Sequence, residues 1–348
     1  MNTIPLLIDG SILEGGGQLL RNSIAFSVLL SKPITIHKIR SGRSPPGLKY
    51  QHAAGSLFSS SIELVINVRY SGLKLVADIC SANLSGAQKG SCSIDFSPGS
   101  TKLPGHFSAD PGTAGATTLL LQVSLPCLLF STASTPSTLT LLGGTNAIQA
   151  PQIEYTQHVF FPFLRQYFGL NLLLDIRKQG YYPKGGGVVV CTISPTTGPL
   201  RAVNLIERGA VTSIEGLAFV GNLPRKIADT MREAATTKLV AAGINPDIIN
   251  ITCTLYQRDR ATGHGSGIVL WAKTEGRCVL GGSAIGKSDL DPASVGDSAA
   301  AELLRNIEHG GCVDEYMQDQ IILFLALAEG ESAVKTGPLT LHTRCGCH

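Results

Sequence analysis

Apolar residues at helical spacing follow a short strand or loop and a polar turn at three places along the chain. These places are residues 8–30, 107–130 and 313–328. The recurrence predicts a repeated α/β module. After the second copy, the pattern predicts a strand over 138–142, a turn over 143–146, a helix over 155–168 and a strand pair around 180–187.

The pattern changes between residues 199 and 310. Alternating apolar positions predict strands over 205–213, 215–220, 249–256 and 267–272, and amphipathic stretches predict helices over 224–242 and 293–307. A segment with this many elements can fold by itself. We therefore predict an inserted α/β domain over 198–310, and a main domain formed by residues 1–197 plus 311–348.

Composition narrows the class of protein. With 348 residues the chain can bury a large core, and its charged fraction of 15% argues against disorder. A formal net charge of +3 is too small to indicate that nucleic acid binds over most of the surface, but it is compatible with a local basic groove. No signal peptide is recognisable, and the apolar stretches 117–130 and 321–328 are too short to cross a bilayer. Nine cysteines without a C-x-x-C pair indicate a reducing compartment, so we expect a soluble intracellular protein.

Three adjacent glycines, Gly15–Gly17, separate the first predicted strand from the first predicted helix. A glycine loop that opens a helix exposes N–H groups at the positive end of the helix dipole, which suits an anion. Glu14 and Arg21 flank the loop as a candidate metal ligand and a candidate phosphate contact. An ordinary strand-to-helix turn with solvated charges gives the same pattern.

Residues 281–288 satisfy the P-loop pattern G-x-x-x-x-G-K-[ST]. A working P-loop needs a helix immediately after the lysine, so that the helix N-terminus faces the phosphates. Here Asp289, Asp291 and Pro292 follow instead, which places two acids where phosphate would bind. We predict that this motif is not a phosphate loop.

Several other polar residues are candidates for chemistry. Arg40 and Arg43 can present two planar guanidinium groups to a phosphate, with Gln51 as a neutral partner, although a solvated basic loop is an equal alternative. Gln122 lies on an apolar helix and must satisfy its amide, either in a structural hydrogen bond or in a site near the 143–146 turn and Pro151.

The third predicted helix carries Tyr316, Asp319 and Gln320 at i, i+3 and i+4, so the three side chains share one face. An aromatic ring, an acid and an amide together can hold a nucleotide base and the partner of a nucleophile; a polar cap of the apolar helix is the alternative. His342 lies at a predicted strand end, where a single histidine is usually structural.

These residues and their order resemble a known family, the RNA 3′-terminal phosphate cyclases, and its animal-type members in particular. The resemblance extends over nearly the whole chain in one order. The blocks that carry it cover residues 9–21, 39–52, 114–122, 143–152, 180–187, 313–320 and 335–343.

The resemblance implies a fold and a reaction. The fold is α/β (α+β), with three repeated βαβαββ modules and a smaller α/β domain inserted before the third. In the reaction, ATP and an RNA 3′-phosphate give a 2′,3′-cyclic phosphate, AMP and pyrophosphate, through a covalent histidyl-AMP intermediate and an RNA-adenylate. Implied partners are ATP, a divalent metal (Mg²⁺ or Mn²⁺) and RNA with a 3′-terminal phosphate; no membrane is implied, and a homodimer is left open. The family's animal members imply a nuclear location.

The same resemblance assigns roles to residues. His342 would be the nucleophile, and Glu14 would bind the metal. Phosphate of ATP or RNA would be held by Arg21, Arg40, Arg43 and Gln51. The nucleotide pocket would be formed by Gln122, Pro151, Tyr316, Asp319 and Gln320, with Asp319 orienting the histidine.

Two departures from the family pattern leave other functions open. Residues 54–70 have no recognisable counterpart, and the family continues beyond the histidine where this chain ends six residues later, as expected of a shortened third module. One alternative is a non-catalytic cyclase-like factor in pre-rRNA processing and ribosome assembly, a branch that lacks the nucleophilic histidine. The other is an inactive truncated isoform.

Overall fold

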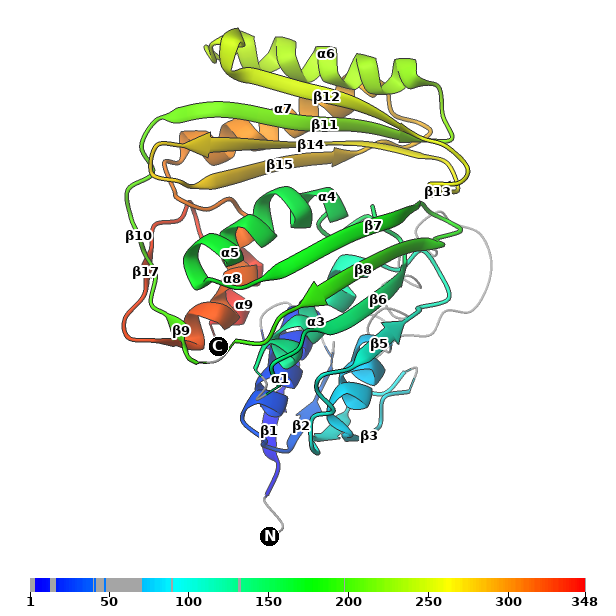
Figure 1. The fold of residues 1–348 in the computed structure, drawn as a ribbon, viewed down its shortest axis with the longest axis vertical. Coiled ribbons are helices and arrows are strands. Elements are labelled where there is room, and N and C mark those ends of the chain that lie inside the picture. Colours follow the sequence, from blue (N-terminus) through cyan, green and yellow to red (C-terminus); the bar gives the residue numbers. More distant parts are fainter. Residues whose placement is uncertain are drawn as a thin grey trace.

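The computed structural model describes residues 4–12, 17–39, 41, 47, 71–88, 90–130, 133–196 and 198–347. Its helices and strands stack in layers, with the N-terminal elements at one end and a helix-covered sheet at the other (Figure 1). No helix among these residues combines the length and apolar character needed to cross a bilayer.

The first sheet is formed by N-terminal strands in the order β1-β2-β4-β3. Its elements are β1 (Leu6–Asp9), α1 (Gly17–Leu29), β2 (Ile34–His37), helical residues 71–80, β3 (Asn83–Ser85) and β4 (Ile94–Ser97). Strands β1 and β2 run parallel, while β4 is antiparallel to both β2 and β3. The order of elements along the chain is therefore β-α-β-α-β-β.

The second sheet repeats this topology in the order β5-β6-β8-β7, with the short β13 beside β7. Its elements are β5 (His106–Ala109), α3 (Thr117–Leu129), β6 (Ser137–Gly143), α4 (Ile153–Tyr155), a π-helical turn (Thr156–Phe160), α5 (Phe161–Phe168), β7 (Leu172–Gly180), β8 (Gly187–Ile193) and β13 (Ala261–Thr262). Again the first two strands are parallel and the hairpin is antiparallel. The expected repeat of the module is confirmed for these two copies.

The chain then forms short parallel pairs that join its distant parts. These are β9 (Leu200–Arg201) with β16 (Ala328–Glu329) and β10 (Asn204–Leu205) with β17 (Ala333–Val334). Between and after them lie α8 (Met317–Ala326) and α9 (Leu341–Gly346). This third set thus has the order β-β-α-β-β-α, with a second sheet-and-helix unit inserted after its first two strands.

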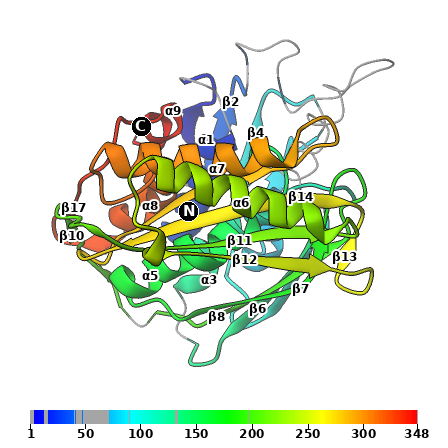
Figure 2. The same cartoon turned by 90° about the horizontal axis from the view of Figure 1, so that it is seen from above.

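The inserted unit contains a sheet in the order β12-β11-β14-β15 with two helices on one face. Its elements are β11 (Val211–Gly221), α6 (Arg225–Ala241), a 3-10 turn (Pro246–Ile248), β12 (Ile249–Tyr256), β14 (Gly265–Thr274), β15 (Val279–Ile285) and α7 (Pro292–Glu308). Figure 2 shows α6 and α7 side by side above the sheet. A separate apolar cluster, including Met231, Leu239 and Leu303, fills the space between these helices and the sheet.

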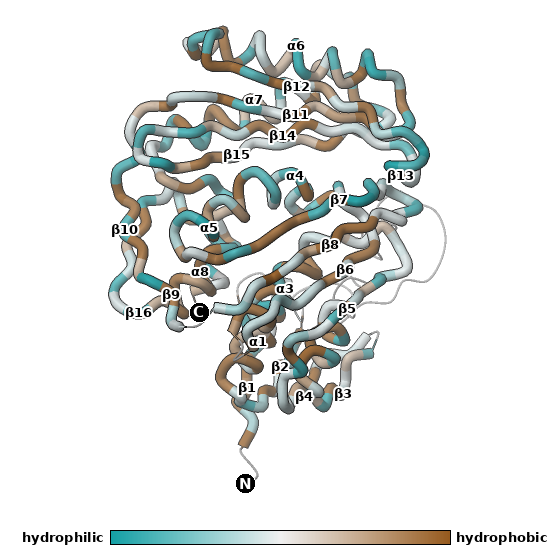
Figure 3. Tube along the Cα trace, in the orientation of Figure 1, coloured by the Kyte–Doolittle hydropathy of each residue, from teal (hydrophilic) through white to brown (hydrophobic). Residues whose placement is uncertain are grey.

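The larger apolar core runs through the first two modules and α8. Helix α3 is buried on nearly all sides, because it lies between the sheet and the other helices. Figure 3 shows apolar segments along β7 and β8, and hydrophilic segments at the turns near β13. The α/β fold class is confirmed, whereas the exact limits of the inserted domain stay a prediction.

Most predicted elements are present, with two differences. The predicted strand 205–213 is wrong over 206–210, which form no strand, whereas its end and the predicted strand 215–220 are one long strand, β11, which has a register shift between Val211 and Ser213. The helix predicted over 155–168 widens into a π-helical turn before α5. Pro162 lacks the N–H group that would bond to the His158 carbonyl in a regular α-helix, which explains the widening.

The P-loop-like motif behaves as predicted. Residues 281–285 belong to strand β15, and the next helix begins only at Pro292. The glycines serve packing instead, because a Cβ atom at Gly282 would lie 2.6 Å from the backbone nitrogen of Leu303 on α7. No helix begins directly after Lys287, so this segment lacks the geometry that holds phosphate.

Candidate active site

Four helices from three parts of the chain bring the predicted nucleotide residues together. Helices α1 and α3 pack against each other, and the short α9 packs against both α1 and α8. They carry Arg21 on α1, Gln122 on α3, Asp319 and Gln320 on α8, and His342 on α9.

Two hydrogen bonds on α3 connect distant predicted residues. Gln122 Nε2 donates to Gln320 Oε1 at 2.9 Å, across 198 positions of sequence. One turn earlier, Thr118 Oγ1 donates to the Pro151 carbonyl at 2.9 Å. Because Thr118 and Gln122 are four residues apart, Pro151 and Gln320 lie along the same face of α3.

A small cavity lies between α1, α3 and α8. Its volume is about 20 Å³, enough for one water molecule, and its polar lining includes Gln18, Arg21, Asn22, Gln122 and Gln320. Three of its polar atoms are buried and find no hydrogen-bond partner within the described part of the chain: Arg21 Nε, Asn22 Nδ2 and Gln122 Oε1. Two unpaired donors and one unpaired acceptor around one cavity can bind a polar ligand, since leaving such groups unpaired costs about 1–3 kcal/mol each.

The charged residues beside this cavity influence one another. Burial lowers the pKa of Arg21 to about 10, although the Asp319 carboxylate opposes this shift. Burial likewise raises the pKa of Asp319, while the nearby Arg21 and His342 lower it. A cation, an acid and an imidazole are thus close enough to interact, and the burial of Arg21 and Asp319 strengthens the attraction between their charged forms.

His342 lies in the first turn of α9 and is exposed, so the expectation of a strand end was wrong. Thr340 caps this helix by accepting a hydrogen bond from the Thr343 N–H at 3.1 Å. The buried Gln318 holds the same turn: its Oε1 accepts from the Thr340 N–H and the Thr343 hydroxyl, and its Nε2 donates to the Pro338 carbonyl. Helix α8 therefore fixes the position of the histidine.

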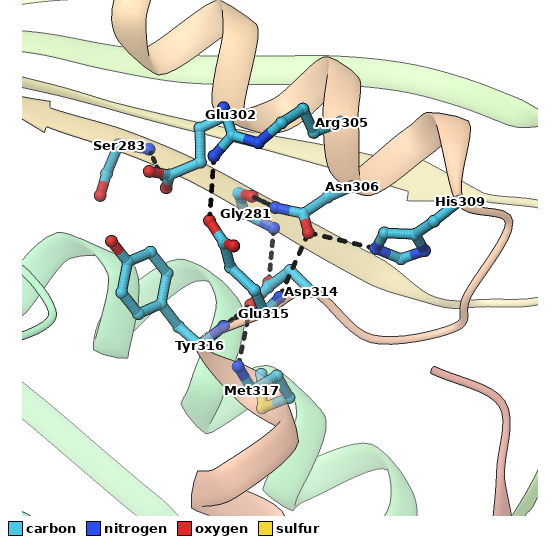
Figure 4. A network of polar contacts seen from close by, with 10 residues as sticks. All are labelled: Gly281, Ser283, Glu302, Arg305, Asn306, His309, Asp314, Glu315, Tyr316 and Met317. Carbon is cyan, nitrogen blue, oxygen red and sulfur yellow. Dashed lines mark hydrogen bonds and ion pairs between the residues drawn. The ribbon is translucent and has the colours of Figure 1, made fainter. Parts of the chain in front are cut away.

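Tyr316 precedes α8 and keeps 38% of its surface exposed. Its ring meets that of Tyr155 edge-on, with centroids 6.0 Å apart. Figure 4 shows the ring extending toward Ser283 and Glu302 of the inserted unit. The three residues predicted on one face thus point to different neighbours, since Gln320 turns to Gln122 and Asp319 to Arg21 and His342.

Asp314 fastens the start of α8 to the rest of the molecule (Figure 4). Its carboxylate accepts from the Tyr155 hydroxyl at 2.7 Å, the Gly281 N–H at 2.7 Å, and the Tyr316 and Met317 N–H groups at 3.0 and 2.9 Å. Burial raises the pKa of Asp314 to about 6 against the effect of these hydrogen bonds. The residue joins the inserted sheet, α4 and α8 at one point.

Four predicted site residues, Glu14, Arg40, Arg43 and Gln51, lie outside the described residues. Within the described ranges, no three histidine, cysteine, aspartate or glutamate side chains converge to hold a metal ion. Sequence reasoning missed Asn22 and Gln318. The available signals were their positions, since Asn22 follows Arg21 and Gln318 precedes Asp319. Neither residue interrupts the apolar spacing of its helix, so the pattern did not single them out.

A sequence model of the RNA 3′-terminal phosphate cyclases matches residues 12–62 and 67–347. The chain belongs to this family. The match leaves out only residues 63–66 of the stretch 54–70, so the expected interruption of the family pattern was too long.

Relatives from distant organisms carry the same description. A probable RNA 3′-terminal phosphate cyclase of Dictyostelium discoideum is 36% identical over 98% of this chain and 75% of its own length. RNA 3′-terminal phosphate cyclases of Staphylothermus marinus and Drosophila melanogaster are 39% and 37% identical, over 97% of this chain and 88% of their own lengths.

Proposed function

We propose that this chain catalyses the ATP-dependent conversion of an RNA 3′-terminal phosphate to a 2′,3′-cyclic phosphate. The observation that carries the proposal is the convergence of Arg21, Gln122 and Asp319 near His342, in a family member whose relatives are described as cyclases. The small cavity adds further unpaired polar atoms beside Arg21 and Gln122.

The proposed first step is attack of a His342 ring nitrogen on the α-phosphorus of ATP. An N–P bond forms, the bond to the bridging oxygen breaks, and pyrophosphate leaves. The Asp319 carboxylate stabilises the positive charge that develops on the imidazole, while Arg21 attracts the phosphate oxygens. A neutral imidazole suits this role because it is nucleophilic near neutral pH.

The proposed later steps pass AMP onward. An oxygen of the RNA 3′-phosphate attacks the phosphorus of histidyl-AMP, which forms an RNA-adenylate and frees the histidine. The adjacent ribose 2′-OH then loses its proton, attacks the terminal RNA phosphorus and expels AMP. Holding this hydroxyl next to the phosphorus makes ring closure an intramolecular step, a proximity effect of several kcal/mol.

The proposed nucleotide pocket uses Gln122, Pro151, Tyr316, Asp319 and Gln320. Gln122 Oε1 and Asn22 Nδ2 have no partner at a cavity that holds one water molecule, so they reach a base or sugar through that water. The exposed ring of Tyr316 can stack on a base. A divalent metal remains an expectation from the family resemblance: it would neutralise ATP phosphates, and Glu14 would be its ligand.

The decisive experiment incubates the purified chain with ATP labelled in the α-phosphate, with Mg²⁺ or Mn²⁺. A labelled protein adduct that is stable to alkali and lost in acid is expected, as is typical of an N–P bond. His342→Ala abolishes the adduct, whereas His106→Ala, an exposed histidine on β5, retains it. A folded wild-type chain that forms no adduct, or an unchanged adduct in His342→Ala, contradicts the proposal and favours the non-catalytic alternatives.

A further inference from the structure

The turn between β7 and β8 meets a loop of the inserted unit, far along the chain. Strand β13 extends the second sheet through Ala261 and Thr262, which pair with Gln179 and Gly180. The Thr262 hydroxyl donates to the Gly186 carbonyl at 3.2 Å, and Asn222 Nδ2 donates to the Ala261 and Gly263 carbonyls. Residues 181–186 and 256–264 thus form one continuous surface.

A buried aromatic side chain fixes this surface. Tyr181 keeps only 3% of its surface exposed, and its ring fits between two glycines of the inserted sheet. A Cβ atom on Gly221 would lie 2.2 Å from Tyr181 Cε2, and one on Gly265 would lie 2.1 Å from Tyr181 Cδ1. Both positions therefore require glycine, and the close packing of the Tyr181 ring fixes the β7–β8 turn against the inserted sheet.

Cations and an aromatic ring project from this rigid support. Tyr182 keeps 45% of its surface exposed, and Lys184, Arg258, Arg260 and His264 are exposed as well. We call these five side chains the basic strip. The segments 181–186 and 256–264 contain three lysine or arginine residues against one acid, Asp259, in a chain whose net charge is only +3. Within the described ranges, none of these three cations makes an ion pair.

A hollow lies beside the strip. Its volume is about 340 Å³, and Leu255 and Tyr256 give it apolar and aromatic walls. Asn222, Gln257, Arg258 and Asp259 form its polar rim. Cationic side chains next to aromatic and apolar surfaces match single-stranded nucleic acid, whose phosphates need cations and whose bases need stacking partners.

We propose that the basic strip binds the single-stranded body of the RNA substrate, upstream of its 3′-terminal phosphate. Arg258, Arg260 and Lys184 contact backbone phosphates, Tyr182 stacks on a base, and the hollow accepts a neighbouring base. The inference rests on the proposed function for the identity of the RNA. The inserted unit then contributes to RNA binding, through a surface that it shares with the β7–β8 turn of the second sheet.

The test compares wild-type protein with the variant Lys184→Gln/Arg258→Gln/Arg260→Gln. Binding of a 12-nucleotide single-stranded RNA with a 3′-phosphate is measured by fluorescence anisotropy at several salt concentrations. We expect a slope of log K against log salt that is shallower by about 2, since each phosphate contact to a single strand contributes about 0.7. At 0.1 M salt this corresponds to about hundredfold weaker binding. Tyr182→Ala weakens binding about tenfold and Tyr182→Phe restores it.

Two controls separate this proposal from others. The variant Arg225→Gln/Lys226→Gln/Lys238→Gln removes three cations from α6, and we expect it to bind RNA like wild type. A 3′-phosphorylated dinucleotide lacks the upstream body that the strip is proposed to bind. The strip variant is therefore expected to cyclise it with unchanged KM, and adduct formation with ATP is expected to be unchanged.

An unchanged salt slope in the strip variant overturns the inference, as does an equal loss in the α6 variant, which indicates a general charge effect. An equal loss of dinucleotide affinity also overturns it. Absence of the ATP adduct in wild-type protein refutes the proposed function instead, while the RNA-binding comparison keeps its meaning.

Discussion

Glu154 is a buried acid that makes stability depend on pH in a measurable way. It lies in α4 with no exposed surface, and its Oε1 accepts a hydrogen bond from Gln179 Nε2 at 2.7 Å. Burial raises its pKa from 4.5 to about 7, and the hydrogen bond offsets only part of this. No cation among its described neighbours contributes to the shift.

The sign and size of the effect follow from linkage. The folded state binds a proton on Glu154 more tightly than the unfolded state, so stability is highest below pH 4.5 and falls as pH rises to about 7. Each pKa unit corresponds to about 1.4 kcal/mol, so the shift represents about 3 kcal/mol at most. A side chain that stays uncharged, such as glutamine, avoids the free-energy cost of a buried carboxylate.

The perturbation is Glu154→Gln, which keeps the shape and the acceptor for Gln179 but cannot ionise. Urea unfolding of wild type and variant is measured from pH 4.5 to 8.5. We expect the variant to gain about 3 kcal/mol relative to wild type between the two ends of this range. Taking the difference cancels other buried acids, such as Asp314 and Glu302, whose pKa values burial also raises.

A difference between the two proteins that stays constant across this range would refute the reasoning. It would mean that Glu154 has the same proton affinity in the folded and unfolded states. A difference that grows toward low pH would reverse the sign, and would require a stabilising cation close to the carboxylate.

Three further substitutions test particular contacts. Gln122→Leu removes the unpaired acceptor and the bond to α8, and should weaken ATP binding about tenfold in calorimetry with little loss of stability. Gln318→Leu frees the turn that carries the histidine, and should slow adduct formation more than it weakens ATP binding in rapid-quench and calorimetric measurements. Asp314→Ala leaves three backbone N–H groups and a hydroxyl unpaired, and should cost about 3 kcal/mol or more in urea unfolding, whereas an unchanged midpoint would show that water replaces it.

Local pattern determined the elements, because apolar periodicity and turn residues act within a few positions. The helices at α1, α3, α6 and α7, the hairpin of β7 and β8, and the exclusion of a P-loop all followed from neighbouring residues. The order of motif blocks also indicated the family before any contact was known. Periodicity did not reveal the π-helical turn or the single long β11, since a proline's missing N–H and a register shift alter hydrogen bonds without altering the apolar pattern.

Tertiary structure alone decided which side chains meet. Gln122 reaches Gln320 because two helices from different modules pack together, and nothing within either helix specifies the other. His342 appeared isolated in the sequence. In the structure, Gln318 and the capping residue Thr340 hold it on the short helix α9 beside Asp319. Contacts between residues that are far apart depend on the register of packed elements, so the sequence named the candidate residues and the fold determined their neighbours.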